Sequence, residues 1–590
     1  MALTAAQIEQ QKKQAEELLF SGGKQELGFA KALFFGRFQA PLVFPYPELR
    51  PEERDTVEQA VAEVNRFFDE KVDSFAVDRD ADIPPAVVAG LSDLGVLGMT
   101  APKEYGGRGF SQTGYCRIME TIGAHDSSIA VFVNAHHSIG IRALLLFGTE
   151  EQKQRWLPDL VSGKQLAAFA LTEPEAGSDA ANVQTMATPS ADGKTFILNG
   201  EKRYITNGGI AQVLTVMART PVPGSSETKV TAFLVTPDLP GFEVVEARMP
   251  KCGIRGTATA RLAFHDMPVP AENILGQLGK GLRIALTVLD FGRTTFGASC
   301  TGAAKTCVAA AVHHAKTRVQ FKQPLSEFEL VKKKIAYMAA HAFAMEATTT
   351  QCAGFIDRGA EDYMLETAML KVFSTEALWQ IVNDTMQIFG GKAYFSDEPY
   401  ERMLRDARIN QIGEGANDVL RAFIALVGMR GVGEHLQGVL KGLKNVLTLF
   451  PTVWRFGRER LAARFTTPDV PVVSKELRPE ARELGKRVRD FGQAVQSLLM
   501  QYREAILERQ YPQERIADAA CDLYAASCTL SRLDHLIAHG KGNGAITTEV
   551  TAGRYFLRLA NRRIRQNLAA LWDNDDAETT KAANAVLGSM

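Results

Sequence analysis

Cysteine is scarce in this chain and is not spaced for metal binding or crosslinking. Seven cysteines are scattered through 590 residues, the count is odd, and no two form a CxxC pair. We therefore expect neither a disulfide framework nor a zinc site, and a reducing compartment fits this usage. The adjacent pairs His136-His137 and His313-His314 point to different faces of a helix, so packed or surface histidines are predicted and no metal site.

An excess of charge of either sign is also missing. The net charge is -1, with 46% hydrophobic and 23% charged residues, which is typical of a globular protein with no reason to bind nucleic acid. The N-terminal stretch has no apolar core of signal-peptide length, and Glu9, Glu16 and Glu17 argue against a transit peptide. No apolar run is predicted to be long enough to span a bilayer, so a cytoplasmic enzyme is expected.

Common nucleotide and metal signatures are absent as well. Gly276, Gly279 and Gly281 lie close together but lack the G-x-G-x-x-G spacing, and no Walker or HExxH sequence occurs. A dinucleotide-binding fold of the parallel strand–helix type is therefore not predicted.

Hydrophobic periodicity divides the chain into helical, strand and again helical regions. A capping box at Thr149 to Gln152 begins one helix, and another ends near Phe389 because Gly390-Gly391 follows. Short alternating runs such as TFILNG, QVLTVMAR, TAFLVTP, FEVVEAR and ARLAFHD predict a β-domain between the helical regions. The expected organisation is an arm at 1–50, a helical domain at 51–167, a β-domain at 168–275, a helical bundle at 276–430 and a helical extension at 431–590.

The turn around Glu414 is the strongest candidate for chemistry. Gly413 and Gly415 flank the carboxylate, and neither brings a side chain, so a ligand can approach closely. Asn417 then opens an apolar helix. Taken alone, a glutamate in a glycine-rich turn is usually solvated surface.

Four motifs in one order identify a relationship. QIFGG at 387–391, LTEP followed by AGSD at 171–179, NGEK followed by ITNG at 199–208, and Arg318 with Gln320-Phe321 resemble the acyl-CoA dehydrogenase family over about residues 50 to 430. The very-long-chain branch also shares the VFPYP segment and a long C-terminal extension. The resemblance implies a mainly α fold with a middle β-domain, formed by a helical N-terminal domain, a small β-barrel or sandwich, a helical bundle and an extra C-terminal helical domain.

The resemblance also implies a reaction. Glu414 would remove the proton next to the thioester carbonyl of a fatty acyl-CoA, and FAD would take the β-hydride at N5, giving the trans-2-enoyl product of fatty acid β-oxidation, with long chains expected. Some relatives carry the base just before the position of Arg293, but this chain has Gly292 there. Ala416 replaces the family's usual threonine, and Tyr204 stands where the very-long-chain branch usually has tryptophan.

The family's ligand contacts map onto particular residues of this chain. The matched FAD positions are Phe169, Leu171, Thr172, Gly177, Ser178, Tyr204, Ile205, Thr206, Arg318, Phe321, Gln387, Gly391, Ala416 and Asp418, and the substrate positions are Ser178, Asp290, Arg293 and Gly415. Arg318 matches an arginine that reaches the flavin pyrophosphate of a neighbouring subunit, which implies a homodimer. Ordinary helix charges are the alternative for Asp290, Arg293 and Arg318.

Two further questions stay open at this level. The electron acceptor is expected to be an electron-transfer flavoprotein, but an acyl-CoA oxidase that passes electrons to oxygen, or an assembly scaffold that uses the extension, are alternatives. Residues 431–465 combine an apolar stripe with basic residues, which fits either a helix packed on the protein or a peripheral helix on anionic membrane.

Overall fold

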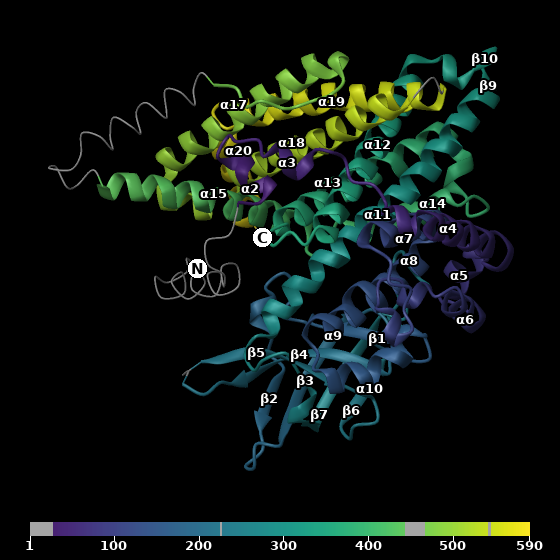
Figure 1. Cartoon of the computed structure of the whole chain (residues 1–590), viewed down its shortest axis with the longest axis vertical. Coiled ribbons are helices and arrows are strands. Elements are labelled where there is room, and N and C mark those ends of the chain that lie inside the picture. The colour runs from purple at the N-terminus through teal and green to yellow at the C-terminus, as the bar shows by residue number, and fades with distance from the viewer. Residues whose placement is uncertain (1–26, 225–226, 443–465, 541–543, 590) are drawn as a thin grey trace. The chain divides into compact units, whose positions relative to one another are not determined.

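The computed structural model describes residues 27–224, 227–442, 466–540 and 544–589 (Figure 1). The chain divides into two compact units. The first contains Leu49–Ala303 and Phe395–Ile409, and the second contains Leu27–Glu48, Ala304–Tyr394 and the described chain from Asn410 onward. The predicted order of helices, strands, helices and a further helical region is confirmed.

The first unit begins with a series of helices, in the region where the sequence predicts a helical domain. They are α4 (Pro51–Lys71), α5 (Ser74–Asp80), α6 (Pro85–Asp93), α7 (Gln112–His125), α8 (Ser127–Val133), the π-helix η3 (Asn134–Ile141), α9 (Arg142–Phe147) and α10 (Glu150–Val161). The predicted capping box at the start of α10 is confirmed, because the Gln152 N–H donates to Thr149 Oγ1 at 3.2 Å and the Thr149 N–H donates to Gln152 Oε1 at 3.1 Å.

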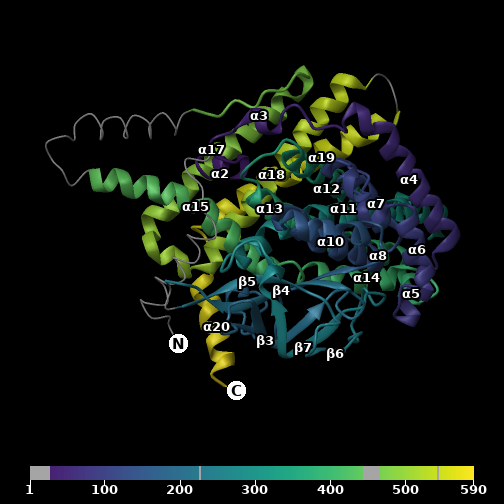
Figure 2. The same ribbon diagram turned by 60° about the horizontal axis from the view of Figure 1, so that its bottom comes forward.

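An eight-stranded sheet follows, and the five predicted strands all lie in it. The strands are β1 (Ala167–Ala170), β2 (Met186–Pro189), β3 (Thr195–Ile205), β4 (Val213–Pro221), β5 (Thr228–Val235), β6 (Phe242–Glu246), β7 (Ala260–Pro270) and β8 (Ile274–Leu275). Their order is β6-β7-β3-β2-β4-β5-β8, with β1 parallel to β4, and Figure 2 shows β3 beside β7. The unit closes with α14 (Tyr400–Asn410) and the first part of α11 (Gly281–Thr317).

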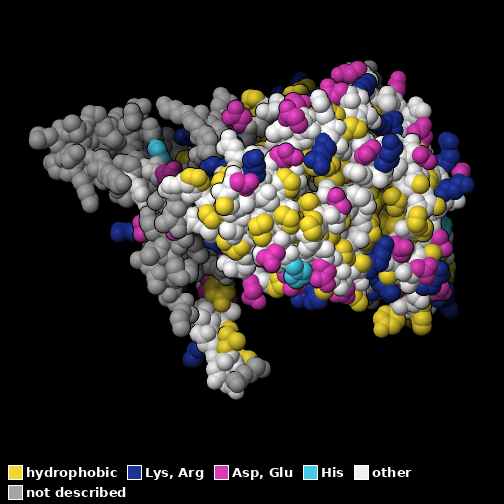
Figure 3. All heavy atoms as spheres, turned by 90° about the horizontal axis from the view of Figure 1, so that it is seen from below, with side chains coloured by type: hydrophobic (Ala, Val, Ile, Leu, Met, Phe, Trp, Pro, Cys, Tyr) yellow, Lys and Arg dark blue, Asp and Glu magenta, His cyan; other side chains and the backbone are white. Residues whose placement is uncertain are grey.

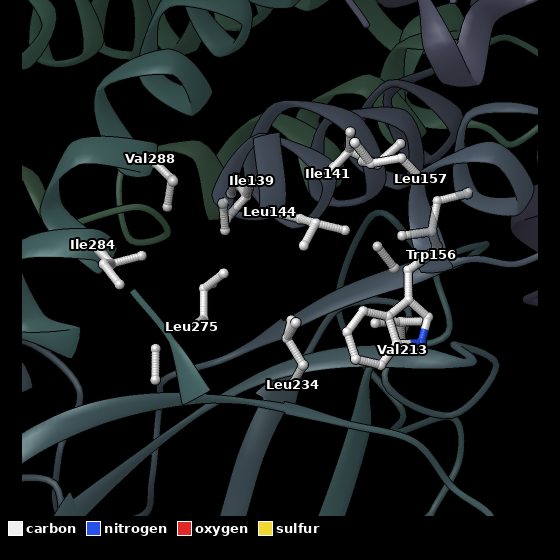
Figure 4. Packing of buried hydrophobic residues seen from close by; sticks show 14 of the residues in the cluster. Ile139, Ile141, Leu144, Trp156, Leu157, Val213, Leu234, Leu275, Ile284 and Val288 are labelled. Carbon is white, nitrogen blue, oxygen red and sulfur yellow. The ribbon is translucent and has the colours of Figure 1, made fainter. Parts of the chain in front are cut away.

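A shared apolar core fixes the sheet against these helices (Figure 4). Trp156 of α10 and Ile284 of α11 pack in the same cluster as Val213 of β4 and Leu234 of β5. Burial of large side chains stabilises such contacts by about 1.5–3 kcal/mol each. The strands that lead to the predicted flavin residues therefore rest on a rigid base.

The histidine pair on η3 is packed inside the first unit, as predicted. His136 and His137 are almost fully buried. His136 Nδ1 accepts from the Ala167 N–H at 2.9 Å, while its Nε2 lies 3.1 Å from the Leu160 carbonyl. Burial lowers the pKa of His136 to about 4. The neutral ring thus joins the helices to the first residue of β1.

One prediction about hydropathy was wrong. The segment Ser127–Phe147 is long and apolar enough to cross a membrane by length and composition. However, 78% of its window is buried within the structure, as in the core helix of a folded domain. Polar residues such as Asn134, His136 and His137 interrupt the apolar run, and all three are buried inside the first unit.

Over its described residues, the second unit consists of helices and one short hairpin. Its elements are α2 (Phe29–Phe34), α3 (Ala40–Val43), the rest of α11, β9 (Val319–Gln320), β10 (Gln323–Pro324), α12 (Glu329–Asp357), α13 (Met364–Phe389), α15 (Asn417–Gly442), α17 (Arg478–Tyr502), α18 (Gln510–His539), α19 (Gly544–Ala570) and α20 (Asp576–Leu587). The predicted end of α13 at Phe389 is confirmed, since Gly390 has a φ of 65°. From the extension, α18 packs on α12, α13 and α15, and α19 packs on α12.

Part of the predicted membrane segment lies outside the described residues. The helix α15 covers its start, up to Gly442, and residues 443–465 are not described. On the face drawn in Figure 3, acidic and basic side chains are interspersed over the described residues, in keeping with the near-neutral composition.

The short helix α2 is held in the second unit by a buried acid. Glu366 is 2% exposed, and its Oε1 accepts from the Ala30 N–H at 2.7 Å. Burial, reinforced by the Asp362 carboxylate and opposed by Lys31, raises the Glu366 pKa from 4.5 to about 8. The folded protein therefore binds a proton here that the unfolded chain releases above about pH 4.5.

We expect this carboxyl group to make the protein less stable as pH rises. Between the unfolded and folded pKa values the native state holds more protons, so the free energy of unfolding falls with pH, by at most about 1.4 kcal/mol per unit. Glu366→Gln keeps an acceptor for Ala30 and removes the titration. Denaturant unfolding at several pH values should show a growing advantage for this variant, whereas the exposed control Glu361→Gln should follow the parent. Parallel curves for Glu366→Gln and the parent would contradict the assignment.

Candidate functional site

Two of the predicted flavin strips lie side by side in the first unit. Phe169 belongs to β1, and Leu171 and Thr172 follow its end, while Tyr204 and Ile205 end β3. The Arg203 N–H donates to the Thr172 carbonyl at 2.9 Å, which joins the two strips. Residues that are far apart in sequence are thus brought together at the ends of β1 and β3.

A buried ion pair beneath these strips was not predicted. Lys202 Nζ lies 2.6 Å from Glu173 Oε1, with side-chain exposures of 0% and 3%. The same ammonium donates to the Leu171 carbonyl at 3.0 Å, and Glu173 accepts from the Thr185 N–H at 3.1 Å. The signal was present, because both residues stand inside the quoted motifs LTEP and NGEK, but their side chains had been given no role.

The ionisation of this pair follows from its surroundings. Burial lowers the pKa of Lys202 to about 8, although Glu173 opposes this shift. For Glu173, burial works against ionisation, but the Lys202 ammonium and the hydrogen bonds from Lys202, Thr185 and Gln184 hold its pKa below the ordinary value. Both groups are therefore charged at neutral pH.

The groups above the pair have the chemistry that a flavin needs. The Tyr204 ring is 56% exposed at a backbone φ of 63°, and the Arg203 guanidinium lies 5.0 Å from its centroid. Thr172 and Thr206 present half-buried hydroxyls, and Gly177 has open space where a Cβ would stand. An exposed aromatic face beside hydroxyl groups and accessible backbone fits the planar, polar-edged ring of FAD. Ser178 is also exposed, whereas Ile205 is buried beneath the strip.

Two predicted substrate residues are paired inside the first unit. Asp290 and Arg293 lie on α11 at 8% and 6% exposure, and Arg293 Nη1 donates to Asp290 Oδ1 at 3.2 Å. An ion pair between residues three apart on one helix agrees with the alternative of ordinary helix charges, although both side chains are buried. Their contact with the CoA part of a substrate stays a prediction.

The second unit carries the other predicted flavin residues on exposed turns. Arg318 precedes the hairpin β9–β10, whose turn contains Phe321 at 89% exposure and φ 52°. Gln387 and Gly391, at the end of α13, are exposed too. The rings of His314 and Phe389 stack 4.1 Å apart, so the base of the hairpin and the end of α13 lie together. Arg318 is exposed within this single chain, and its contact with a flavin stays a prediction.

The turn that bears Glu414 lies between α14 and α15, in the second unit. Glu414 has a φ of 55° and Gly415 a φ of 98°, so the left-handed backbone continues through both. A non-glycine residue in this region costs about 1–3 kcal/mol and is typical of functional turns. The Glu414 side chain is half-buried, as is Ala416, while Asp418 is exposed.

A second unpredicted residue supports this turn. Lys371 of α13 is fully buried, and its Nζ donates to the Gly415 carbonyl and to Asn417 Oδ1, both at 2.8 Å. The available signal was the single lysine in the helical segment MLETAMLKVFSTEALW, where apolar residues stand on either side of it. Its partners could not be predicted because they lie more than forty residues further along the chain.

Sequence comparison finds matches to family profiles over most of the chain. Residues 54–164, 168–267 and 279–428 match the N-terminal, middle and C-terminal domains of acyl-CoA dehydrogenases. Residues 475–589 match the ACAD9/ACADV C-terminal domain.

Whole-chain comparisons agree with these matches. The chain is 36% identical to a mitochondrial very long-chain specific acyl-CoA dehydrogenase of Macaca fascicularis, covering 92% of this chain and 84% of the relative. It is 33% identical to the probable acyl-CoA dehydrogenase FadE10 of Mycobacterium bovis, covering 98% and 91%. A crystal structure of an acyl-CoA dehydrogenase complexed with FAD from Bacillus anthracis superposes with a TM-score of 0.78 at 28% identity, covering 93% of this chain and 94% of that one.

Proposed function

The chain belongs to the acyl-CoA dehydrogenase family, an FAD-dependent family of oxidoreductases, and from this premise we propose that Glu414 is its general base. The observation that carries the proposal is a half-buried carboxylate in a left-handed turn next to Gly415. Glu414 would take the proton from the carbon next to the thioester carbonyl of a fatty acyl-CoA. The glycine on either side leaves room for that carbon to approach.

The chain's own groups would also stabilise the charge that develops in this step. Loss of the α-proton moves negative charge onto the thioester oxygen, and the backbone N–H of Glu414 is a fixed donor that would bind it. Thr172, Tyr204 and Thr206 would hold and orient the flavin ring. Bound FAD supplies the acceptor for the β-hydride, so that the product is the trans-2-enoyl thioester.

We further propose long-chain acyl-CoA as substrate, supported by the very-long-chain relatives and by the matched extension. Anaerobic titration of the purified protein with acyl-CoAs from butyryl to eicosanoyl, followed by flavin absorbance, tests the proposal. We expect loss of the oxidised flavin band with the long chains and formation of the enoyl product. If no chain length causes this loss, or if aerobic turnover yields hydrogen peroxide in step with substrate loss, the dehydrogenase assignment fails.

The assembly and acceptor are part of the same proposal. Arg318 and Phe321 on an exposed hairpin support a homodimer in which Arg318 reaches the flavin pyrophosphate of the second subunit, because a guanidinium fork suits phosphate oxygens. An electron-transfer flavoprotein is the proposed acceptor. We place the enzyme in the cytoplasm, as the composition and the bacterial relative suggest.

A further inference from the structure

The turn that carries Glu414 is bound at both ends by one carboxylate. Glu376 Oε1 accepts from Asn417 Nδ2 at 2.9 Å, and its Oε2 accepts from Gln411 Nε2 at 2.8 Å. The Asn417 N–H also donates to the Gln411 carbonyl at 3.0 Å. Gln411 and Asn417 flank Glu414 at three residues on either side, so this carboxylate closes the loop that presents the base.

The middle of the turn is held from the same helix. Lys371 lies on α13 near Glu376, and it donates to the Gly415 carbonyl and to Asn417 Oδ1. A buried ammonium is costly unless its donors are satisfied, so these two bonds fix the turn strongly. The left-handed backbone at Glu414 is thereby held against relaxation.

This polar network extends into the C-terminal extension. Arg421 of α15 donates through Nη2 to Glu376 Oε1 at 3.2 Å and through Nε to Asp518 Oδ1 at 2.8 Å. Asp518 belongs to α18, inside the segment that matches the ACAD9/ACADV C-terminal domain. Both α13 and α15 pack against α18 in the second unit (Figures 1 and 2). The Arg421 side chain is 15% exposed and that of Asp518 is 33% exposed.

We propose that Lys371, Glu376 and Arg421 are positioning residues for Glu414, and that the C-terminal extension acts on the reaction through Asp518. The inference rests on the proposed function, because it takes Glu414 as the base. Asp518 holds the Arg421 guanidinium, Arg421 orients the Glu376 carboxylate, and Glu376 fixes Gln411 and Asn417. The extension then serves to set the geometry of proton abstraction, in addition to any role it has in assembly.

The test compares two substitutions that each disturb an ion pair between the extension and the bundle. Asp518→Asn keeps the shape of the side chain but removes its charge. Glu346→Gln is the matched control, since Glu346 Oε2 of α12 lies 2.7 Å from Arg532 Nη1 of α18, and Arg532 also pairs with Glu549 of α19. Both are made in the full-length holoenzyme, with FAD content and melting temperature measured alongside turnover.

We expect Asp518→Asn to lower kcat by about 10-fold and Glu376→Gln by up to about 100-fold, with KM for acyl-CoA and FAD content within about twofold of the parent, because a small displacement of a catalytic group is costly. The pH dependence of kcat should shift in both variants. The double variant should lose less than the product of the single losses, because both substitutions act through one network. Asp518→Glu should recover part of the turnover.

The control separates this network from general stability. Equal kcat values and superimposable pH profiles for Asp518→Asn and Glu346→Gln overturn the inference, as does a kcat loss that simply follows melting temperature. If Glu414 is not the general base, the result is different: the Glu414→Gln variant then turns over at the parent rate. An inactive Glu414→Gln together with an unimpaired Asp518→Asn rejects only the role of the extension.

Discussion

Glu414→Gln is expected to bind FAD and acyl-CoA normally and to lose turnover by about 100- to 10,000-fold, the range over which a positioned general base contributes. Glutamine has nearly the same shape as glutamate and leaves the Glu414 backbone N–H in place, so binding should survive. It cannot accept the α-proton, and the oxidised flavin band should therefore persist when substrate is added without oxygen. Rapid-mixing absorbance measurements give the rate, and equilibrium binding of a long-chain enoyl-CoA gives the affinity.

A glutamate on the following helix provides the comparison. Glu434 of α15 pairs with Arg430 at 2.8 Å and is 63% exposed at its side chain, so Glu434→Gln should turn over like the parent. If Glu414→Gln reduces the flavin at the parent rate, another group is the base. The position used by some relatives is Gly292, buried in α11, and it has no side chain to take that role.

Features determined by neighbouring residues were predictable from sequence. The capping box at Thr149 and Gln152 and the end of α13 before Gly390 both depend on local backbone chemistry. Five of the eight strands of the first unit, β3 to β7, were predicted for the same reason, since alternation is a property of each segment alone. The family could be identified because several motifs, each weak alone, occur along the chain in the order typical of that family.

The supports of the candidate site were not predictable, because they join distant segments. Glu173 and Lys202 are separated by twenty-nine positions, and Lys371 and Gly415 by forty-four. The spacing of apolar residues predicts which face of a helix is buried. It does not predict which backbone carbonyl accepts a hydrogen bond from a buried lysine. Asp518 is the extreme case: its partner Arg421 lies ninety-seven residues earlier, and nothing in the extension's own pattern indicated contact with the catalytic region.

Lys202→Met is expected to destabilise the protein by about 3–5 kcal/mol, because it leaves the Glu173 carboxylate buried without its counter-ion. It also removes the donor to the Leu171 carbonyl, so the strip before Thr172 should loosen. We therefore expect weaker FAD retention as well as a lower melting temperature. Denaturant unfolding of the apoprotein and fluorescence titration with FAD measure the two effects separately. The exposed control Lys194→Met, just before the strand β3 that carries Lys202, should change stability by less than about 0.5 kcal/mol.

The second half of this prediction uses Glu173→Gln in the Lys202→Met background. Removing both charges should recover much of the lost stability, because the main cost in the single variant is an uncompensated buried charge and not the missing attraction. FAD affinity should recover less, since the hydrogen bond to Leu171 is still absent. If the double variant is as unstable as the sum of the two single variants, the pair does not interact as its 2.6 Å separation implies. If stability and FAD affinity recover together, the ion pair stabilises the fold but does not itself position the strip for the flavin.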